Sequence, residues 1–214
     1  MPDVRARRKY DASFRRRQAG ETRMRMLDAA EALFAERGFA ATTMDAIAAA
    51  AGVAPDTVYS AFRSKTGVLH ALLDVRVGGD DQPIALLDRP GPQAVKAQPI
   101  PKRQIAAFAS GVAGILDRAR PIDEIMRSAA AVDPDVRALR EHMSRTRYEN
   151  LVQLVSWLAA HGPFRGGISR EEAAAIVWTL ASPEVNGMLR RERGWSTERY
   201  ATWLADALTR TLLP

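Results

Sequence analysis

The stretch that decides the fold is residues 42–65, which read TTMDAIAAAAGVAPDTVYSAFRSK. Thr42 is followed three residues later by an acidic side chain, a pattern typical of a helix start, and it predicts a short alanine-rich helix over about 43–50. Gly52 ends this helix, and a second short helix is predicted over about 54–62. Two short helices joined by a tight glycine turn are typical of a helix-turn-helix, which places its second helix in the major groove of DNA.

The second short helix is predicted to have an apolar face and a polar face. Val58 and Phe62 are expected to point inward, which leaves short or planar hydrogen-bonding side chains on the outside. Such side chains can approach the edges of bases without a steric clash. The predicted outward residues are Pro55, Asp56, Thr57, Tyr59 and Ser60.

Several of the polar side chains have two interpretations. Asp56 either accepts hydrogen bonds from the first amides of its helix, which Ala54 cannot cap, or accepts from a cytosine amino group. Tyr59 either faces DNA or packs half-buried against the head. Lys65 and Thr43 lie near the starts of two helices, where an ammonium or a hydroxyl can contact a phosphate. The alternative for Lys65 is a solvated surface lysine.

Residues 42–65 resemble the DNA-binding signature of the TetR family of bacterial transcriptional regulators. The preceding amphipathic run, which ends AERGF at 35–39, resembles it too, so the resemblance covers about residues 22–75. The segment from Trp178 to Leu204 is similar to the C-terminal domains of some regulators of this family. The resemblance implies an all-α homodimer, with an N-terminal three-helix helix-turn-helix domain and a C-terminal helical bundle that binds a ligand and dimerises.

The resemblance also implies roles for individual residues. Residues 54–62 correspond to the recognition helix, and Thr43, Tyr59 and Lys65 correspond to residues that contact phosphates. Ala61 departs from the family pattern, in which a larger His or Tyr is common, so any contact by that side chain is lost. In the family, an effector in the C-terminal domain separates or reorients the two DNA-binding heads and lowers operator affinity.

Positive charge is concentrated at the N-terminus. The chain has a net charge of +6, and residues 1–20, with seven basic and two acidic side chains, are predicted to be a basic disordered arm. This arm is either a solubilising tail or a segment that contacts phosphates and the minor groove. Its candidate contacts are Arg15, Arg16 and Arg17. A chain that used only this arm would coat nucleic acid without sequence preference, which is the alternative function.

Proline and glycine divide the remaining chain. The helix-turn-helix domain is predicted over 21–77, and residues 78–101 are predicted to be a linker with one short helix near 93–97. Apolar stripes at helical spacing then predict a regulatory and dimerisation domain over 102–214. Its helices are expected at 102–119, from Pro121, at 134–160, at 170–181 and at 196–212. The last two are expected to pair two protomers.

Aromatic and methionine side chains of the C-terminal region are candidates for lining an effector pocket. The same spacing is also typical of plain hydrophobic core. The candidates are Phe108, Met126, Met143, Tyr148, Trp157 and Trp178. His142 and His161 are further polar candidates for such a pocket.

Several functional classes are disfavoured by what the sequence lacks. The chain has no cysteine, and its three histidines have no metal-ligand spacing, so we expect no metal site and no cofactor. Neither a glycine-rich phosphate loop nor a catalytic elbow motif is present, so an enzyme is not expected. No apolar run approaches the ~18–20 residues that span a bilayer. The basic N-terminus also lacks the apolar segment of a signal peptide.

Together, these patterns predict a cytoplasmic, homodimeric, sequence-specific transcriptional regulator. We expect a repressor that binds double-stranded operator DNA of pseudo-palindromic sequence. A small-molecule effector is expected to release it from that DNA.

Overall fold

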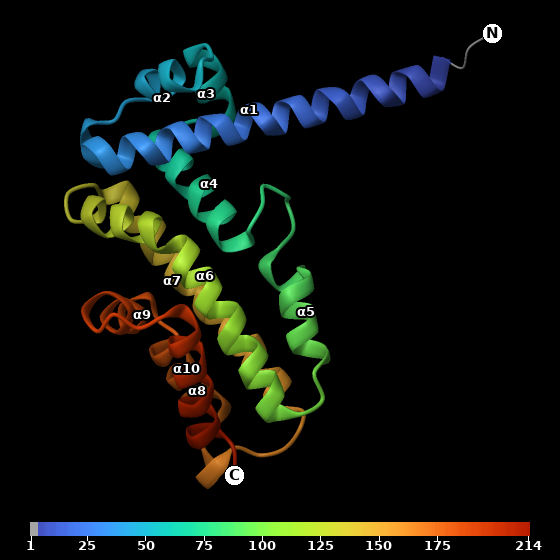
Figure 1. Ribbon diagram of the computed structural model, residues 1–214, viewed down its shortest axis with the longest axis vertical. Helices are drawn as coiled ribbons and strands as arrows, with labels where there is room; N and C mark the ends of the chain where they lie inside the picture. The colour runs from blue at the N-terminus through green and yellow to red at the C-terminus, as the bar shows by residue number, and fades with distance from the viewer. Residues whose placement is uncertain (1–3) are drawn as a thin grey trace.

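The computed structural model describes residues 4–214, with side chains described from Arg17 onward. The regular elements in this part of the chain are all helices, so the predicted all-α class is confirmed. Figure 1 shows an N-terminal head at one end of the molecule and a helical bundle that makes up the rest. Among the described residues, no helix combines the length and hydropathy needed to cross a membrane.

The head consists of four helices. α2 and α3 lie on the side of α1 that faces away from the bundle, and α4 leads from the head towards the bundle (Figure 1). The bounds are α1 (Val4–Ala41), α2 (Met44–Ala51), α3 (Pro55–Phe62) and α4 (Lys65–Gly78). The two short helices therefore match their predicted ranges within one residue at each end.

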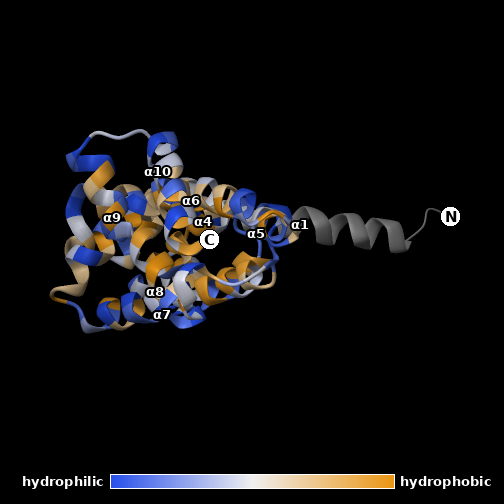
Figure 2. Cartoon of the chain, turned by 90° about the horizontal axis from the view of Figure 1, so that it is seen from below, coloured by the Kyte–Doolittle hydropathy of each residue, from blue (hydrophilic) through white to orange (hydrophobic). Residues whose placement is uncertain are grey.

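Longer helices form the bundle. They are α5 (Pro90–Ala97), α6 (Pro101–Ala130), α7 (Pro134–Ala159), α8 (Arg170–Leu180), α9 (Pro183–Gly187) and α10 (Thr197–Leu212). Short helical turns lie at Leu86–Asp88 and Arg165–Gly167, and a π-helical turn lies at Met188–Glu192. Seen from below in Figure 2, apolar residues of these helices gather between the ribbons and polar residues lie outside.

Side-chain caps begin most of the helices where the sequence predicts. Asp133 accepts from two amides at the start of α7, and Ser196 caps α10. Ser169 and Glu172 form the predicted capping box of α8, in which each side chain bonds the backbone N–H of the other residue. These caps satisfy N–H groups that have no partner within a helix, so they set where each helix starts.

The cap of α2 differs from the prediction by one residue. The hydroxyl of Thr43 accepts from the N–H of Ala46 at 3.0 Å, whereas Thr42 is buried and donates to the carbonyls of Leu33 and Gly38. Thr42 therefore ties the start of α2 to the end of α1. Its burial against α1 removes it from the capping position, which the sequence pattern alone did not distinguish.

Two regions are more helical than predicted. α1 begins at Val4, so residues 4–20, expected as a disordered arm, are helical in the structure. The prediction of two helices meeting at Pro121 is wrong, because α6 runs through this residue without a break. Pro121 is exposed, while Leu116 before it and Ile122 after it are buried. Packing on both sides of the proline holds α6 together despite the missing backbone hydrogen bond.

The segment 78–101 is held in place by a buried arginine. The guanidinium of Arg89 donates to the carbonyls of Gly78 and Gln82 at 2.9 and 3.0 Å, and it pairs with Asp80 at 3.0 Å. Arg118 of α6 donates to the carbonyl of Arg76. The C-terminal end of α4 is therefore bonded to both the linker and the bundle.

Buried apolar side chains form two separate cores. The head-side core combines α1–α4 with the second half of α6 and the start of α7, through Ala119, Ile122, Met126, Ala129 and Val136. The distal core combines the first half of α6 with α5, α7, α8 and α10, and includes Ile105, Leu154, Val177, Tyr200 and Leu208. α6 thus contributes to both cores. The core of the head extends beyond the predicted domain 21–77, and the predicted domain division stays a prediction.

Candidate nucleic-acid interface

The outer face of α3 has the amphipathic division that the sequence predicts. Val58 and Phe62 are buried in the head-side core. The residues predicted to face outward are all exposed, and 47% of the Tyr59 surface is accessible. These residues are Pro55, Asp56, Thr57, Tyr59 and Ser60. α3 therefore presents several exposed polar side chains on a packed support, although contact with bases or phosphates stays a prediction.

α3 starts without a side-chain cap. Ala54 offers none, and the amide of Thr57 bonds the carbonyl of Ala54 at 2.9 Å instead. Pro55 occupies the first turn, where its missing N–H leaves one donor fewer to satisfy. The carboxylate of Asp56 is exposed and makes no hydrogen bond to any residue that the structure describes. The geometry therefore offers no support for the capping interpretation of Asp56.

Thr43 can combine its capping role with the predicted phosphate contact. Its oxygen accepts from Ala46, and a hydroxyl that accepts a bond still has a hydrogen to donate. The residue is exposed at the start of α2. A phosphate near this helix start would receive that donor together with the positive end of the helix dipole.

Lys65 makes bonds within the head that its sequence position does not indicate. Its ammonium donates to the carbonyls of Phe39 and Ala40 at 2.6 and 3.2 Å, and lies 4.3 Å from the centre of the Phe39 ring. Lysine has three N–H donors, so one remains for a phosphate. Lys65 therefore joins the start of α4 to the end of α1, and its phosphate contact stays a prediction.

Arg23 of α1 contacts the last residue of α3. Its guanidinium lies 4.6 Å from the centre of the Phe62 ring and pairs with Asp81 at 3.0 Å. Arg76 of α4 pairs with Glu31 of α1. These contacts fix α3 and α4 against α1, so the outer face of α3 is carried on a rigid platform.

The turn between α3 and α4 contains an unusual backbone conformation. Arg63 has φ 65° and ψ −41°, and it has the one positive φ among described residues other than glycine. The N–H of Ser64 donates to the carbonyl of Phe62 at 2.7 Å, which closes a three-residue γ-turn around Arg63. A conformation of this kind costs about 1–3 kcal/mol for a residue with a side chain. The sequence contains no signal for it, because arginine has no preference for positive φ.

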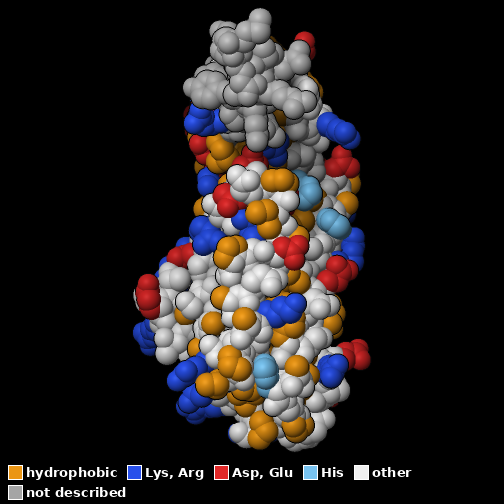
Figure 3. All heavy atoms as spheres, turned by 90° about the vertical axis from the view of Figure 1, so that its right-hand side faces the viewer, with side chains coloured by type: hydrophobic (Ala, Val, Ile, Leu, Met, Phe, Trp, Pro, Cys, Tyr) orange, Lys and Arg blue, Asp and Glu red, His pale blue; other side chains and the backbone are white. Residues whose placement is uncertain are grey.

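The three arginines of the predicted arm are described unequally. The side chains of Arg15 and Arg16 lie outside the described residues, and Arg17 is exposed on α1. Below the grey atoms in Figure 3, basic and acidic side chains alternate over the visible face, so positive charge is not gathered into one field there. The role of the arm in DNA contact stays a prediction.

The six candidate pocket residues fall into two groups. Met126 and Met143 belong to the head-side core. The other four, Phe108, Tyr148, Trp157 and Trp178, are half-buried against the distal core. The tertiary structure thus separates residues that the sequence placed together, and their role in a pocket stays a prediction.

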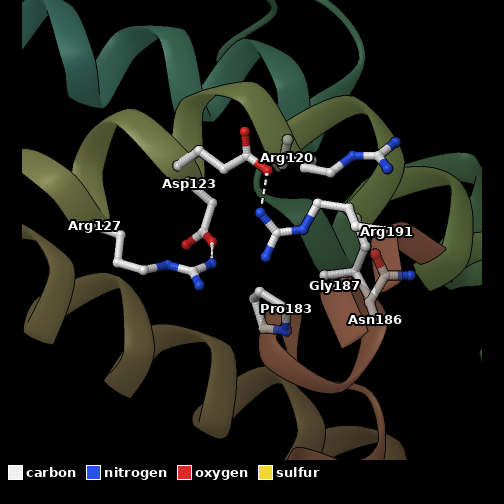
Figure 4. A pocket seen from close by; sticks show the side chains of 10 residues that line it. Arg120, Asp123, Arg127, Pro183, Asn186, Gly187 and Arg191 are labelled. Atoms are coloured by element: carbon white, nitrogen blue, oxygen red, sulfur yellow. Dashed lines mark hydrogen bonds and ion pairs between the residues drawn. The ribbon is translucent and has the colours of Figure 1, made fainter. Parts of the chain in front are cut away.

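Neither of two hollows in the bundle is lined by these six residues. One, of about 130 Å³, lies at the distal end between the start of α6, the α7–α8 loop and the last residues, and is lined by Pro101, Leu158, His161, Gly162, Pro163, Phe164, Leu213 and Pro214. The other, of about 30 Å³, lies between α6 and α9 (Figure 4). Arg191 pairs with Glu124 of α6 across this second hollow at 3.0 Å, whereas Arg127 and Asp123 pair with each other along α6.

Polar groups in the bundle connect helices that are distant in sequence. Arg147 donates to the carbonyl of Trp178 at 3.0 Å and lies 4.8 Å from the centre of its ring, and burial lowers the pKa of this arginine. The hydroxyl of Tyr200 donates to the carbonyl of Leu180 at 3.1 Å, and burial raises the pKa of this phenol. Both contacts join α8 to its neighbours, α7 and α10.

Asp117 on α6 joins three segments of the bundle. Its carboxylate accepts from Nη2 of Arg190 at 3.0 and 3.2 Å and from Nε of the same residue at 3.3 Å. It also accepts from the hydroxyl of Thr197 at 2.6 Å and from Arg120. Burial alone would raise the pKa of Asp117, but the bonds from Thr197 and Arg190 and the charges of Arg120 and Arg190 outweigh it, so the pKa lies below 3.8. This network fixes the π-helical turn and the start of α10 to α6.

Comparison with known proteins gives matches to the head and to the whole fold. Residues 26–72 match the sequence model described as "Bacterial regulatory proteins, tetR family". The HTH-type transcriptional regulator TtgR of Pseudomonas putida is 27% identical over 178 residues, which is 81% of each chain.

Solved structures share the fold over most of the chain. NalD, the secondary repressor of the MexAB-OprM multidrug efflux pump in Pseudomonas aeruginosa, is 23% identical with a TM-score of 0.69 over 92% of this chain and 97% of its own. SmeT, the repressor of the Stenotrophomonas maltophilia multidrug efflux pump SmeDEF, is 22% identical in a complex with triclosan. Its TM-score is 0.68 over 91% of this chain and 92% of its own. At these identities the structures establish a common fold and nothing finer.

Proposed function

Since the chain belongs to the TetR family of bacterial transcriptional regulators, we propose that it is a sequence-specific repressor whose homodimer leaves a pseudo-palindromic operator when a small molecule binds the bundle. The family places it among regulators and not among enzymes. The observation that carries the proposal is the exposed polar face of α3 on buried Val58 and Phe62. A face that is both rigid and polar is what reading base edges requires.

The residues of the head divide into two roles. Pro55, Asp56, Thr57 and Ser60 read bases, whereas Thr43, Tyr59 and Lys65 contact phosphates and set the position of α3 in the groove. The arm through Arg15, Arg16 and Arg17 adds affinity that depends on salt. DNA binding places the protein in the cytoplasm, where bacterial chromosomal DNA lies.

The dimer forms through α8 and α10, and this pairing would bring two α3 helices into successive major grooves about 34 Å apart. Half-buried apolar side chains on these helices, such as Ile176, Trp203 and Ala207, support the pairing because a partner surface would complete their burial. Because these side chains are partly exposed in a single chain, we expect the partner protomer to cover them.

A small molecule in the bundle would favour one spacing of the two heads over the other. Such a ligand shifts the equilibrium only by its difference in affinity for the two arrangements, about tenfold for each ~1.4 kcal/mol. The repressor role of NalD and SmeT, and the triclosan complex of SmeT, support a repressor with a small-molecule effector. The proposed lining residues remain Phe108, Met126, Met143, Tyr148, Trp157 and Trp178.

Selection of bound genomic fragments tests this proposal. The best fragment is titrated by fluorescence anisotropy at physiological salt, beside a scrambled fragment of equal length. We expect roughly a 10³-fold or greater preference for a pseudo-palindromic fragment. Equal affinity for both fragments, with a steep dependence on salt, would instead indicate a protein that coats nucleic acid through its basic arm.

Single substitutions in α3 test the division of roles. Thr57→Ala is expected to lose about 1–3 kcal/mol of discrimination at particular base pairs and little affinity for scrambled DNA. Tyr59→Ala is expected to weaken binding to all sequences. Ser110→Ala, at an exposed hydroxyl of α6 outside the head and the proposed dimer helices, is the control and should leave both affinities unchanged. A loss for Thr57→Ala that is equal on every sequence would contradict its role in reading bases.

A further inference from the structure

We propose that Arg63 is a phosphate-contacting residue of the head, and that the strained γ-turn between α3 and α4 is retained because it directs this side chain. The inference rests on the proposed DNA-binding function and adds a residue to it. Its starting point is the backbone of Arg63, whose φ of 65° and ψ of −41° are rare for any residue with a Cβ atom. Glycine adopts positive φ without a steric penalty, so an arginine at this place indicates a use for its side chain.

The turn is held by contacts on both sides. A Cβ atom at Gly67 would collide with the carbonyl oxygen of Phe62, so the γ-turn brings this oxygen directly against α4. Ser64 caps α4 by accepting from the N–H of Gly67 at 3.0 Å. Arg23 lies over the Phe62 ring at 4.6 Å. A change of Arg63 to negative φ would displace both Ser64 and Phe62 and would disturb the cap of α4.

The pairing of the basic side chains at this corner, the turn between α3 and α4, also favours Arg63 as the phosphate contact. The ammonium of Lys65 donates to two carbonyls at the end of α1, and the guanidinium of Arg23 pairs with Asp81. The side chain of Arg63 is exposed and has no hydrogen bond or ion pair within the part of the chain that the structure describes. The whole guanidinium of Arg63 is therefore available to a phosphate, whereas Lys65 has one N–H left and Arg23 is already paired.

The position of Arg63 suits a phosphate beside the recognition helix. It follows the last residue of α3, and its N–H bonds the carbonyl of Tyr59, one helical turn earlier. Tyr59 is exposed on the outer face of α3, which lies on the side of α1 away from the bundle (Figure 1). A backbone phosphate there would meet a planar guanidinium that can bind two of its oxygens.

Three substitutions at this position separate charge from backbone strain. Arg63→Ala removes the charge and keeps a Cβ atom, Arg63→Gly removes both, and Arg63→Lys keeps the charge. Arg103→Ala is the matched control, because it removes an exposed arginine at the start of α6 far from the head. Each purified full-length variant is titrated against the selected fragment and against scrambled DNA at several salt concentrations. Its thermal midpoint, Tm, is measured in parallel.

We expect Arg63→Ala and Arg63→Gly to bind both DNA fragments about tenfold more weakly at physiological salt. The slope of log affinity against log salt concentration should fall by about 0.9 for each protomer, as for one lost phosphate contact. Arg63→Lys should keep the wild-type slope, and Arg103→Ala should keep both slope and affinity. Arg63→Gly should raise Tm by roughly 2–4 °C relative to both wild type and Arg63→Ala.

Unchanged affinity and slope in Arg63→Ala would overturn the phosphate contact. A Tm for Arg63→Gly no higher than that of Arg63→Ala would overturn the role of strain. A failure of the proposed function can be distinguished from a failure of this inference, because it would appear in the wild-type protein as equal affinity for selected and scrambled DNA. The slope on scrambled DNA would still test Arg63 in that case.

Discussion

The head and the distal bundle use their polar residues in opposite ways. On α3 the polar residues point to solvent and form few bonds with the rest of the chain, while the apolar side packs against α1 and α4. In the bundle, Asp117, Arg147 and Tyr200 are drawn into contacts that tie one helix to another. The polar side chains of α3 are therefore available to a partner molecule, whereas those of the distal bundle fix the relative positions of its helices.

α6 is where the two regions meet. Its first half lies in the distal core and its second half in the head-side core. A ligand that moved the first half would carry the second half with it, because the helix continues through Pro121. Arg118 adds a bond from α6 to the end of α4. Because α6 is shared, the two regions can be compared by how far each unfolds and moves independently of the other.

The largest expected effect comes from substitutions that create a cavity in one core at a time. Ile122→Ala, in the half of α6 that packs on the head, and Leu208→Ala, in α10, should each lower the free energy of unfolding by about 3 kcal/mol, since both residues are fully buried. Hydrogen exchange should rise mainly in α1 and α4 for Ile122→Ala and mainly in α8 and α10 for Leu208→Ala. Urea titration measures the loss. The same exchange pattern in both variants would show one cooperative unit and would remove the distinction between the cores.

An intermediate effect is expected from the network around Asp117. Asp117→Asn should lower the free energy of unfolding by about 1.5–3 kcal/mol at pH 7, because hydrogen bonds to a charged acceptor are lost. The pKa of this carboxyl is lower in the folded chain than its unfolded value of about 3.9, so its contribution is complete above that value and is lost as pH falls through the folded pKa.

Measurement of stability against pH tests this network. The difference between wild type and Asp117→Asn should stay constant from pH 7 to pH 5 and shrink below pH 4. Asp206→Asn is the control, since Asp206 forms an exposed ion pair with Arg210 at 2.9 Å. Such a pair is worth at most about 1 kcal/mol. A difference for Asp117→Asn that stays constant down to pH 2 would refute the assignment.

The smallest expected effect compares equivalent caps in the two regions. Thr43 and Ser169 both accept from the N–H three residues later, at 3.0 and 3.2 Å. Thr43→Ala and Ser169→Ala should each lower the free energy of unfolding by about 1 kcal/mol. Only Thr43→Ala should also weaken DNA binding, because it removes a proposed phosphate donor. Equal DNA affinity in the two variants would restrict Thr43 to a cap.

Much of the local structure was predictable from the sequence. Gly52 with its positive φ, Pro134 after Asp133, and the box of Ser169 with Glu172 act within one turn of backbone, so they mark helix ends whatever packs around them. The alternation of buried and exposed residues on α3 was equally readable, because helical spacing decides which side chains share a face.

Interactions across long stretches of chain were decided by the tertiary structure. The sequence alone determined that the chain is helical and carries a helix-turn-helix. The tertiary structure decided that α6 crosses Pro121, that Lys65 bonds the end of α1, that Met126 joins the core of the head, and that Arg63 takes positive φ. The physical reason is that each of these outcomes depends on the free energy of contacts with residues far along the chain. That packing can override the local preference of a proline or an arginine.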